Sequence, residues 1–525
     1  MGKTYDVVIA GGGHNALATG AYLAKAGMEV CIVEKMGYVG GAVATREIIA
    51  PGFRLDTASV VHLLVHPNPL LMNDELGLIS KYGLKYITPD VQVIVHFQDG
   101  ERLTVYKDVD KTCQDIARFS EKDAEAYRRF YNWGIGSLNA LLEGFFAPPP
   151  PFGTFMEQAG QTAEGRELLR ALMMSSIDIV SDWFENEKVR VGITRFVTEA
   201  MMHPGTKGTG LQLLLLIPLL HEFGMGLPVG GSGALSESLE RCLLDYGATI
   251  KTGVTVKEFK VAGGECKGIV LQTGEEIIAK KVVISNLNIK QMFPGMVDKA
   301  DLPAGFIPQV QRLYASDFAH FFQGYALHEA PDYKAGSEIK EALMLEFAPN
   351  TLEEYLRYFD DIKYGIPRHS PLAVCQTYHD PSRAPEGKHT LYLYEYAPYH
   401  LKSGGPKKWD EIKQDYANTS LGYLREYTTN MGDENIIGRF ARSPIDSERW
   451  NWANLEGDFA HIGSQLWQSM GNRPLPIWNY RTPVKKLYLS SASCHPGTGV
   501  MAGAGRAAAM VIMEDLGLSF EKVVS

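Results

Sequence analysis

The run Gly-Gly-Gly-His-Asn-Ala over 11–16 constrains the fold more than any other part of this sequence. It follows an apolar run over 5–10 that is typical of a buried strand, and it begins a small-residue pattern over 14–26 that is typical of a helix. A second apolar run over 29–34 ends on Glu34. This order predicts a βαβ unit, and the acidic residue about 20 residues after the glycines completes a dinucleotide-binding fingerprint.

Each position of this fingerprint has a physical role. Gly11 permits a tight turn, and Gly13 lets the backbone approach a pyrophosphate. Ala16 keeps the helix close to the sheet, while the helix N-terminus faces the negative phosphates. Glu34 can accept hydrogen bonds from ribose hydroxyls but would repel a 2′-phosphate, which disfavours NADP; the fingerprint alone does not distinguish NAD from FAD. The predicted dinucleotide contacts in this unit are Gly11, Gly13, His14, Asn15, Ala16, Glu34 and Lys35.

Composition narrows the class of protein. The 525 residues include 45% hydrophobic side chains, which is enough for a large packed core. Lys and Arg number 51 against 61 Asp and Glu, so the net charge is −10, which argues against a nucleic-acid partner. Six cysteines lie far apart without a C-x-x-C pair, so we expect no metal site and no disulfide framework, and a reducing, cytoplasmic compartment fits best. No apolar run reaches the ~18 residues needed to cross a bilayer.

Later segments predict further parts of the dinucleotide-binding domain. A glycine-rich stretch at 229–233 leads into an amphipathic helical pattern over 234–246. Three alternating runs separated by glycine-containing turns predict a β-meander, and the tail returns to a strand, a glycine-rich loop and a helix. The meander runs are 254–261, 266–272 and 276–285, and the tail elements are 487–490 and 503–516.

The remaining segments mix helices with strands and are rich in aromatic residues. A hairpin is expected at 91–97 and 101–106, a helical stretch over 114–146, and a stiff break at the four prolines of 148–151. We therefore expect an α/β fold in which a Rossmann-like domain, a parallel sheet plus the β-meander, is interleaved with an α+β substrate domain. The first is expected to comprise 1–60, 222–295 and 480–525, and the second 61–221 and 296–479.

Six runs along the chain carry a resemblance to a known family. They are 13–17, Gly40-Gly41-Ala42, Pro51-Gly52-Phe53, Asp380-Pro381 with Ala384-Pro385 and Gly387, Tyr480-Arg481-Thr482-Pro483, and 495–501. Together they make the chain resemble a flavoprotein superfamily that contains monoamine oxidases, phytoene desaturases and Rab GDP-dissociation inhibitors. Within it, the chain is most similar to the carotenoid-desaturase and retinol-saturase branch, especially the pyridine nucleotide-disulfide oxidoreductase domain 2-like proteins. The resemblance covers most of the chain.

The resemblance implies that the cofactor is FAD and that the Rossmann-like domain is an FAD-binding domain. Gly40-Gly41 is similar to the second glycine motif of the superfamily, which lies along the pyrophosphate and flavin. The run 254–256 is similar to the strand whose backbone holds the adenine. The further cofactor contacts implied are Gly40, Gly41, Ala42, Arg46, Val256, Ser285, Asn286, Gly499, Val500 and Met501.

Two departures from the superfamily pattern bear on the site. Many members carry Arg directly after the paired glycines, whereas this chain has Ala42. In the terminal loop, Ser491-Ala492-Ser493 and Thr498 stand where the resembling branch has glycines. The first departure favours the less characterised branch over the amine oxidases, and the second weakens the inferred contacts of the terminal loop.

A flavin accepts a hydride, so the protein must hold a substrate C–H near the flavin ring and exclude water. We expect a desaturase that removes hydrogens from adjacent carbons of an apolar, isoprenoid or alicyclic small molecule and passes the electrons to oxygen or a quinone. The alternatives are an amine oxidase, an isomerase that uses reduced flavin, and a non-catalytic binding protein similar to the GDP-dissociation inhibitors. An apolar substrate would come from a membrane or a carrier, so peripheral membrane contact stays open.

Candidate substrate-side residues precede or lie in the terminal loop. His495 could act as a base or stabilise its loop, and Arg473 and Arg481 could bind a carboxylate, the pyrophosphate or an acidic side chain. Cys494 could bond to a flavin, although the resembling branch generally binds FAD without a covalent bond. The predicted catalytic residues are His495, Tyr480 and Trp478, with His461 and Trp467 as further candidates.

Overall fold

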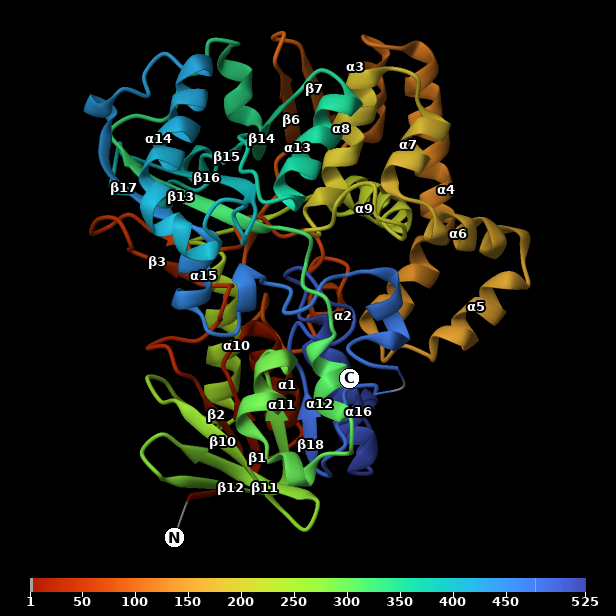
Figure 1. The fold of residues 1–525 in the computed structure, drawn as a ribbon, viewed down its shortest axis with the longest axis vertical. Helices are drawn as coiled ribbons and strands as arrows, with labels where there is room; N and C mark the ends of the chain where they lie inside the picture. The colour runs from red at the N-terminus through yellow and green to blue at the C-terminus, as the bar shows by residue number, and fades with distance from the viewer. Residues whose placement is uncertain (1–2, 477) are drawn as a thin grey trace.

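Two seven-stranded sheets organise the chain. The computed structural model describes residues 3–476 and 478–525, so residues 1 and 2 of the first expected segment and residue 477 lie outside the description. Figure 1 shows one sheet at each end of the long axis, with β1, β2, β10–β12 and β18 in the lower half and β6, β7 and β13–β17 in the upper half. The α/β fold class predicted from the sequence is confirmed.

The lower sheet has a parallel core. Strand β1 (Lys3–Ala10) lies between β12 (Glu276–Ser285) and β2 (Val30–Val33), and β9 (Thr249–Lys251) pairs with the far side of β2. Strand β18 (Leu487–Leu489) pairs with the carboxyl end of β12, also in parallel. Because neighbouring parallel strands end at the same edge, three distant segments of the sequence meet there.

Small residues let three helices pack closely beside this sheet. Helix α1 (His14–Lys25) packs against α10 (Gly233–Asp245) and α16 (Gly503–Asp515). A Cβ added at Gly505 of α16 would lie 3.0 Å from the Cβ of Ala18, so the two helix backbones touch. The Thr19 hydroxyl donates to the Gly505 carbonyl at 3.0 Å, which fixes this contact.

The predicted β-meander is confirmed, with one difference at its start. Strands β10 (Val256–Ala262) and β11 (Glu265–Leu271) run antiparallel to each other, and β11 runs antiparallel to β12. The first strand begins two residues later than expected, because the backbone N–H of Val254 donates to the carbonyl of Glu34 at 2.9 Å rather than to a meander strand.

The upper sheet mixes segments from the middle of the chain. Neighbouring strands are antiparallel except for β14 and β6, which are parallel. The residues of β13 and β16 alternate between two faces, one of which packs on helix α14 through Phe321 and Tyr416 at 4.7 Å between ring centroids. In sheet order, the strands are β17 (Ile436–Arg442), β13 (Ala319–Leu327), β16 (His389–Ala397), β15 (Leu372–Val374), β14 (Met344–Ala348), β6 (Val91–Phe97) and β7 (Arg102–Tyr106).

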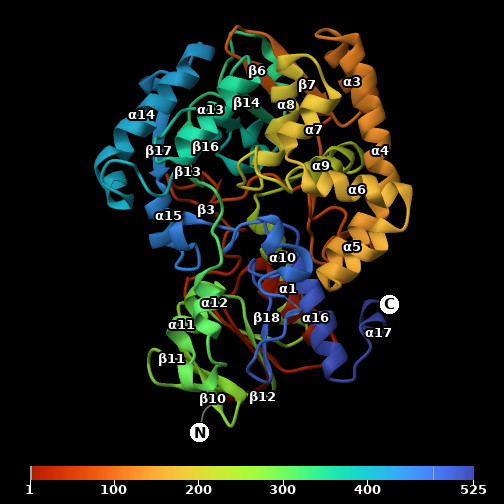
Figure 2. The same cartoon turned by 45° about the vertical axis from the view of Figure 1, so that its right-hand side comes forward.

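The expected helical stretch over 114–146 is wrong in detail, because it consists of two helices. Asp108 caps the first helix, and Ser120 begins the second by accepting from the N–H of Asp123. The break at the prolines is confirmed, since the second helix ends at Phe146. Figure 2 shows α3 to α6 along one side of the molecule, with α4 and α5 reaching from the upper half toward α16. The helices of this region are α3 (Val109–Ala117), α4 (Glu121–Phe146), α5 (Phe152–Gly160), α6 (Ala163–Met173), α7 (Ser176–Trp183), α8 (Glu187–Thr198) and α9 (Gly210–Glu222).

Of the residues that the structure describes, no helix is both long and apolar enough to cross a membrane.

The two sheets agree with the expected division of the chain. The strands of the lower sheet fall in 1–60, 222–295 and 480–525, and those of the upper sheet fall in 61–221 and 296–479. The domain boundaries themselves stay a prediction. The remaining elements are β3 (Thr45–Arg46), β4 (Leu55–Asp56), β5 (Tyr86–Ile87), β8 (Leu227–Pro228), α2 (Pro69–Met72), α11 (Ile289–Met296), α12 (Phe306–Gln311), α13 (Leu352–Lys363), α14 (Trp409–Tyr427), α15 (Pro444–Trp450) and α17 (Glu521–Val524).

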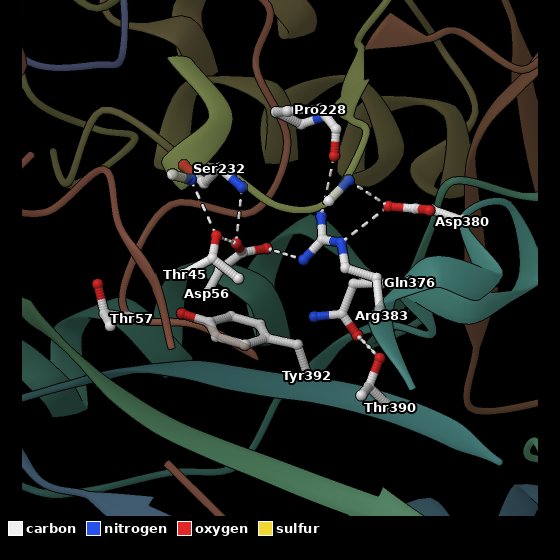
Figure 3. Close-up of polar contacts among 12 residues, drawn as sticks. Thr45, Asp56, Thr57, Pro228, Ser232, Gln376, Asp380, Arg383, Thr390 and Tyr392 are labelled. Atoms are coloured by element: carbon white, nitrogen blue, oxygen red, sulfur yellow. Dashed lines mark hydrogen bonds and ion pairs between the residues drawn. The ribbon is translucent and has the colours of Figure 1, made fainter. Parts of the chain in front are cut away.

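A buried ion cluster joins the upper sheet to the segment that leads into α10. Arg383 is fully buried and donates to Asp56 at 2.7 Å, to Asp380 at 3.1 Å and to the Pro228 carbonyl at 3.3 Å (Figure 3). The backbone N–H of Ser232 donates to Asp56 at 2.7 Å, so both carboxylates and the guanidinium are bonded within the protein. These contacts give Asp380 and Arg383 a structural role.

Replacing Arg383 tests how much this cluster stabilises the fold. Arg383→Met leaves two buried carboxylates without their cation, which costs about 3–5 kcal/mol of stability. We expect the thermal unfolding midpoint, followed by circular dichroism, to fall by several degrees.

Arg357→Met serves as the matched control. Arg357 is exposed, and its ion-pair partner among the described residues is Glu353 one helical turn away, so its loss should leave the unfolding midpoint nearly unchanged. Equal melting temperatures for the two variants would contradict the role given to Arg383.

Candidate functional site

The loops after the parallel strands meet at one edge of the lower sheet. Asn286 follows β12, and its backbone N–H donates to the carbonyl of Ala10, the last residue of β1, at 2.8 Å. Its side-chain amide donates to the carbonyl of Ser490, which follows β18, at 3.0 Å. One residue therefore ties the beginning, the middle and the end of the chain together, at the position where ligands of α/β proteins bind.

The N-terminus of α1 opens at this edge without a side-chain cap. Gly13 is the N-cap residue, none of the side chains that the structure describes accepts from the first N–H groups, and the first turn carries no acidic residue. Unsatisfied N–H groups and the helix dipole together make such a terminus a binding position for an anion.

Glu34 stands at the end of β2, beside the glycine turn. Its carboxylate accepts from the N–H of Gly12 at 2.6 Å and from the N–H of Met36 at 2.7 Å. Burial raises the pKa of Glu34, whereas these two backbone donors lower it. The carboxylate is thus held rigidly at the edge, and its remaining lone pairs can accept from hydroxyl groups.

Gly40 brings the second glycine motif against the first. Its N–H donates to the carbonyl of Gly12 at 2.8 Å, and its φ of +112° lies in the region that favours glycine. A Cβ at this position would lie 2.8 Å from the Ser236 hydroxyl and closer still to the Val43 carbonyl. The close approach of the two glycine turns therefore depends on the absence of a side chain.

These elements enclose a narrow groove of about 150 Å³. A wider depression of about 730 Å³ adjoins it, since Met36 and Trp450 line both, so a ligand longer than the groove can extend past Trp450. Eleven of the predicted cofactor residues line the groove: Gly11, Gly13, His14, Asn15, Glu34, Lys35, Gly40, Gly41, Ala42, Val256 and Asn286.

Two histidines in the groove are uncharged. Burial lowers the pKa of His14 to about 4, and its Nε2 has no hydrogen-bond partner among the described residues. Burial also lowers the pKa of His461 to about 3, with a smaller contribution from the Arg473 guanidinium. His461 Nδ1 lies 3.3 Å from the Ser493 hydroxyl. At neutral pH both imidazoles can exchange hydrogen bonds with a ligand without adding charge.

The three predicted catalytic residues do not line the groove in the described part of the chain. The Tyr480 hydroxyl donates to the His495 carbonyl at 2.8 Å, and His495 Nε2 lies 2.9 Å from the Gly144 carbonyl on α4. Trp478 stacks on Phe306 at 5.1 Å between ring centroids. The structure brings Tyr480 and His495 together, but none of the three is among the described residues that line the groove, and their catalytic role stays a prediction.

The predicted contacts of the terminal loop and three other positions also lie outside the groove. Arg46 lines the adjoining depression, where its guanidinium lies 4.3 Å from the centre of the Tyr38 ring. The Met501 carbonyl accepts from the Asn68 amide at 2.6 Å. Ala16 and Ser285 are buried, and the roles predicted for Ala16, Arg46, Ser285, Gly499, Val500 and Met501 stay predictions.

The two candidate arginines make contacts within the protein. Arg473 is buried and donates to five backbone carbonyls, among them Gly463 at 2.7 Å and Ala492 at 2.8 Å, so it ties the 460–463 segment to the 492–494 segment. Arg481 pairs with Asp515 of α16 at 2.8 Å. Of the alternatives considered for Arg481, these contacts favour the ion pair.

One wall of the groove comes from a segment that sequence reasoning missed. Helix α15 begins with a capping box, in which Ser443 and Asp446 satisfy each other's backbone N–H, and it delivers the following residues to the groove. Two of the seven tryptophans stand in this run, which is the only local signal for it. The additional lining residues are Trp450, Asn451, Trp452, Ala453, Asn454 and Phe459.

The residues present fit an elongated dinucleotide. A carboxylate for ribose hydroxyls, an uncapped helix N-terminus and two glycine turns line one groove, and His14, whose Nε2 is orphaned, belongs to the same lining. Trp450, Trp452 and Phe459 line the groove too. This set of groups matches a dinucleotide, which has ribose hydroxyls, a pyrophosphate and ring systems, better than it matches a compact ligand.

Comparison with known proteins agrees with this class of site. Residues 9–73 match the model of the NAD(P)-binding Rossmann-like domain. The chain is 30% identical to pyridine nucleotide-disulfide oxidoreductase domain-containing protein 2 of Rattus norvegicus, over 98% of this chain and 94% of that protein. It is 26% identical to a limonene dehydrogenase polypeptide of Castellaniella defragrans, over 98% of this chain and 96% of that protein.

Solved structures show the same fold. A putrescine oxidase variant superposes with a TM-score of 0.62 at 14% identity, over 98% of this chain and 99% of that one. The chain belongs to the flavin amine oxidase and carotenoid desaturase superfamily of oxidoreductases, as the resemblance predicted.

Gly40→Ala tests whether the groove is the dinucleotide site. The methyl group has no room between Val43 and Ser236, so the two glycine turns must separate. We expect the purified variant to retain less than about a tenth of the dinucleotide content of the native protein, because a separation of even 1 Å removes close backbone contacts.

Gly27→Ala is the matched control. Gly27 also has a positive φ, +85°, but a Cβ there meets nothing within 4 Å. It carries only the conformational cost, about 1 kcal/mol, and should keep its dinucleotide. Full dinucleotide content in both variants would place the ligand elsewhere.

Proposed function

We propose that this protein is an FAD-dependent dehydrogenase that desaturates a C–C bond of an apolar, isoprenoid or alicyclic substrate. The observation that carries the proposal is that Glu34, the uncapped N-terminus of α1 and Asn286, which joins the ends of β1 and β18, all line one groove. The superfamily membership supports flavin chemistry at that groove.

The chain's own residues would bind and orient the cofactor. Glu34 would accept from the ribose hydroxyls, the backbone near Val256 would hold the adenine, and the N–H groups at Gly13 would face the pyrophosphate. When bound, the flavin supplies a hydride acceptor. Trp450 and Phe459 would cover part of a bound cofactor with apolar surface and so limit its contact with water.

The relatives support oxidation of a carbon–carbon bond over oxidation of an amine. Limonene, named in one relative, is an alicyclic isoprenoid hydrocarbon, and that relative matches the chain along almost its full length. The likeness to a putrescine oxidase rests on 14% identity and supports the fold alone. The electron acceptor we propose is oxygen or a quinone.

An absorption spectrum followed by anaerobic titration tests the proposal. We expect the purified protein to be yellow, with the two-banded visible spectrum of an oxidised flavin. Anaerobic addition of an alicyclic or isoprenoid compound should bleach the long-wavelength band, because hydride transfer reduces the flavin.

Three outcomes would contradict the assignment, each in a different way. Bleaching by primary amines alone would favour amine oxidation. A product of unchanged mass would favour isomerisation, and a colourless protein that cannot be reconstituted with FAD would favour a binding protein.

A further prediction concerns how the flavin is attached. Burial raises the pKa of the Cys494 thiol to about 12, and the residue is 1% exposed, so the reactive thiolate is scarce at neutral pH. We expect acid precipitation to release all the flavin as unmodified FAD, and Cys494→Ser to carry the same flavin content as the native protein. Flavin that stays with the acid-precipitated native protein but not with the variant would show a thioether bond.

A further inference from the structure

One face of the upper sheet carries polar and aromatic side chains in register. His320 of β13 lies opposite Tyr396 of β16, and Phe322 lies opposite Tyr394. Because side chains alternate along a strand, these four share the face that is not covered by α14. The His320 ring lies 5.4 Å from each tyrosine ring, so they form one cluster.

A carboxylate from another element reaches this cluster. Glu199 directly follows α8 and accepts from the Tyr394 hydroxyl and from the Tyr396 hydroxyl, each at 2.6 Å. Each carboxylate oxygen is thus bonded once, and an ionised carboxylate has about four lone-pair positions. Two acceptor positions remain for another partner.

Glu199 faces an accessible space inside the protein. Its side chain is exposed, yet burial by surrounding protein is the largest cause that raises its pKa. His320 is half-buried, burial lowers its pKa to about 3, and its Nδ1 has no hydrogen-bond partner among the described residues. Side chains that are surrounded by protein and still accessible line an interior space rather than the outer surface.

Phe459 connects this space to the groove. It lines the groove, and its ring lies 5.5 Å from the Phe322 ring and 6.3 Å from the His320 ring. Phe459 therefore borders both the groove and the aromatic face that leads to Glu199.

We propose that Glu199, oriented by Tyr394 and Tyr396, binds a hydroxyl group on an otherwise apolar substrate and so decides which carbons lie at the groove. This inference rests on the proposed function and adds the substrate's polar group to it. The hydroxyl donates to the carboxylate and accepts from the N–H of the neutral His320 imidazole, while the apolar body lies against Phe322 and Phe459.

Hydrogen-bond matching favours a hydroxyl over an ammonium group at this position. Arg442 is buried 4.6 Å from the centre of the Phe322 ring and 6.0 Å from that of Phe459, so a cation already occupies these aromatic faces. Arg195, which is buried near Glu199, forms a close ion pair with Glu346. An ammonium group at Glu199 would gain an ion pair, whereas a hydroxyl can both donate to Glu199 and accept from the N–H of His320.

Binding of four ligands with one isoprenoid ring skeleton tests the proposal. Calorimetry on the purified holoprotein gives the Kd for perillyl alcohol, its methyl ether, perillylamine and limonene. We expect the native protein to bind the alcohol about tenfold more tightly than the ether, because only the alcohol donates a hydrogen bond to the charged carboxylate. Glu199→Gln should remove most of this preference and change the Kd of the ether less than about twofold.

Glu222→Gln is the matched control, because Glu222 also accepts from a tyrosine hydroxyl, that of Tyr131 at 2.5 Å, but lies on the outer surface. It should leave all four affinities unchanged. Tyr394→Phe keeps the ring and removes one orienting hydroxyl, so it should reduce the alcohol preference even if the Glu199 variant does not fold.

Three results overturn the inference: no preference for the alcohol in the native protein, a preference that survives Glu199→Gln, or tightest binding of the amine. Anaerobic flavin bleaching of the same samples separates this inference from the proposed function. If the flavin bleaches but the protein does not prefer the alcohol, the role of Glu199 is wrong and the dehydrogenase activity still stands. If the protein prefers the alcohol but the flavin does not bleach, the dehydrogenase activity is wrong and the binding site still stands.

Discussion

The buried Arg383 cluster is the constraint on which the placement of the two sheets depends. Moving one guanidinium and two carboxylates out of water costs several kcal/mol per charge, and this cost is offset only when all partners are in place. Those partners come from β4, from the turn before β16 and from the segment that begins α10. Helix α10 packs on α1. The cluster therefore links the segment that precedes β16 of the upper sheet to the helix whose N-terminus opens the groove.

The first βαβ unit could be predicted from the sequence because its signals are local. The glycine turn, the small residues of α1 and the position of Glu34 all lie within 34 residues, and each follows from backbone geometry or helix packing alone. The meander and the tail helix α16 were predicted for the same reason. The break between α3 and α4 was not, because one serine cap at Ser120 outweighs a continuous helical pattern.

Other parts of the site could not be predicted because nothing near them in the sequence signals their partners. Trp450 and Phe459 join the groove through the position of α15, more than 400 residues after Glu34. The alternation along β16 indicates two faces, but not which face lies open. The sequence around Glu199 is that of an ordinary carboxylate at the end of a helix. Only the fold brings it to the hydroxyl groups of Tyr394 and Tyr396.

The charges around the groove decide which end of an elongated cofactor lies where. His14 and His461 are neutral, so a bound pyrophosphate would depend on the backbone dipoles at Gly13 and would avoid the carboxylate of Glu34. A bound ribose would then lie beside Glu34, which can accept from its hydroxyl groups. Phe459 packs against the face that carries Phe322, so the proposed cofactor site and the space before Glu199 share this one wall. In this proposal the upper sheet selects the substrate and the dinucleotide-binding domain holds the cofactor. The same dinucleotide-binding domain can therefore serve proteins with different substrates.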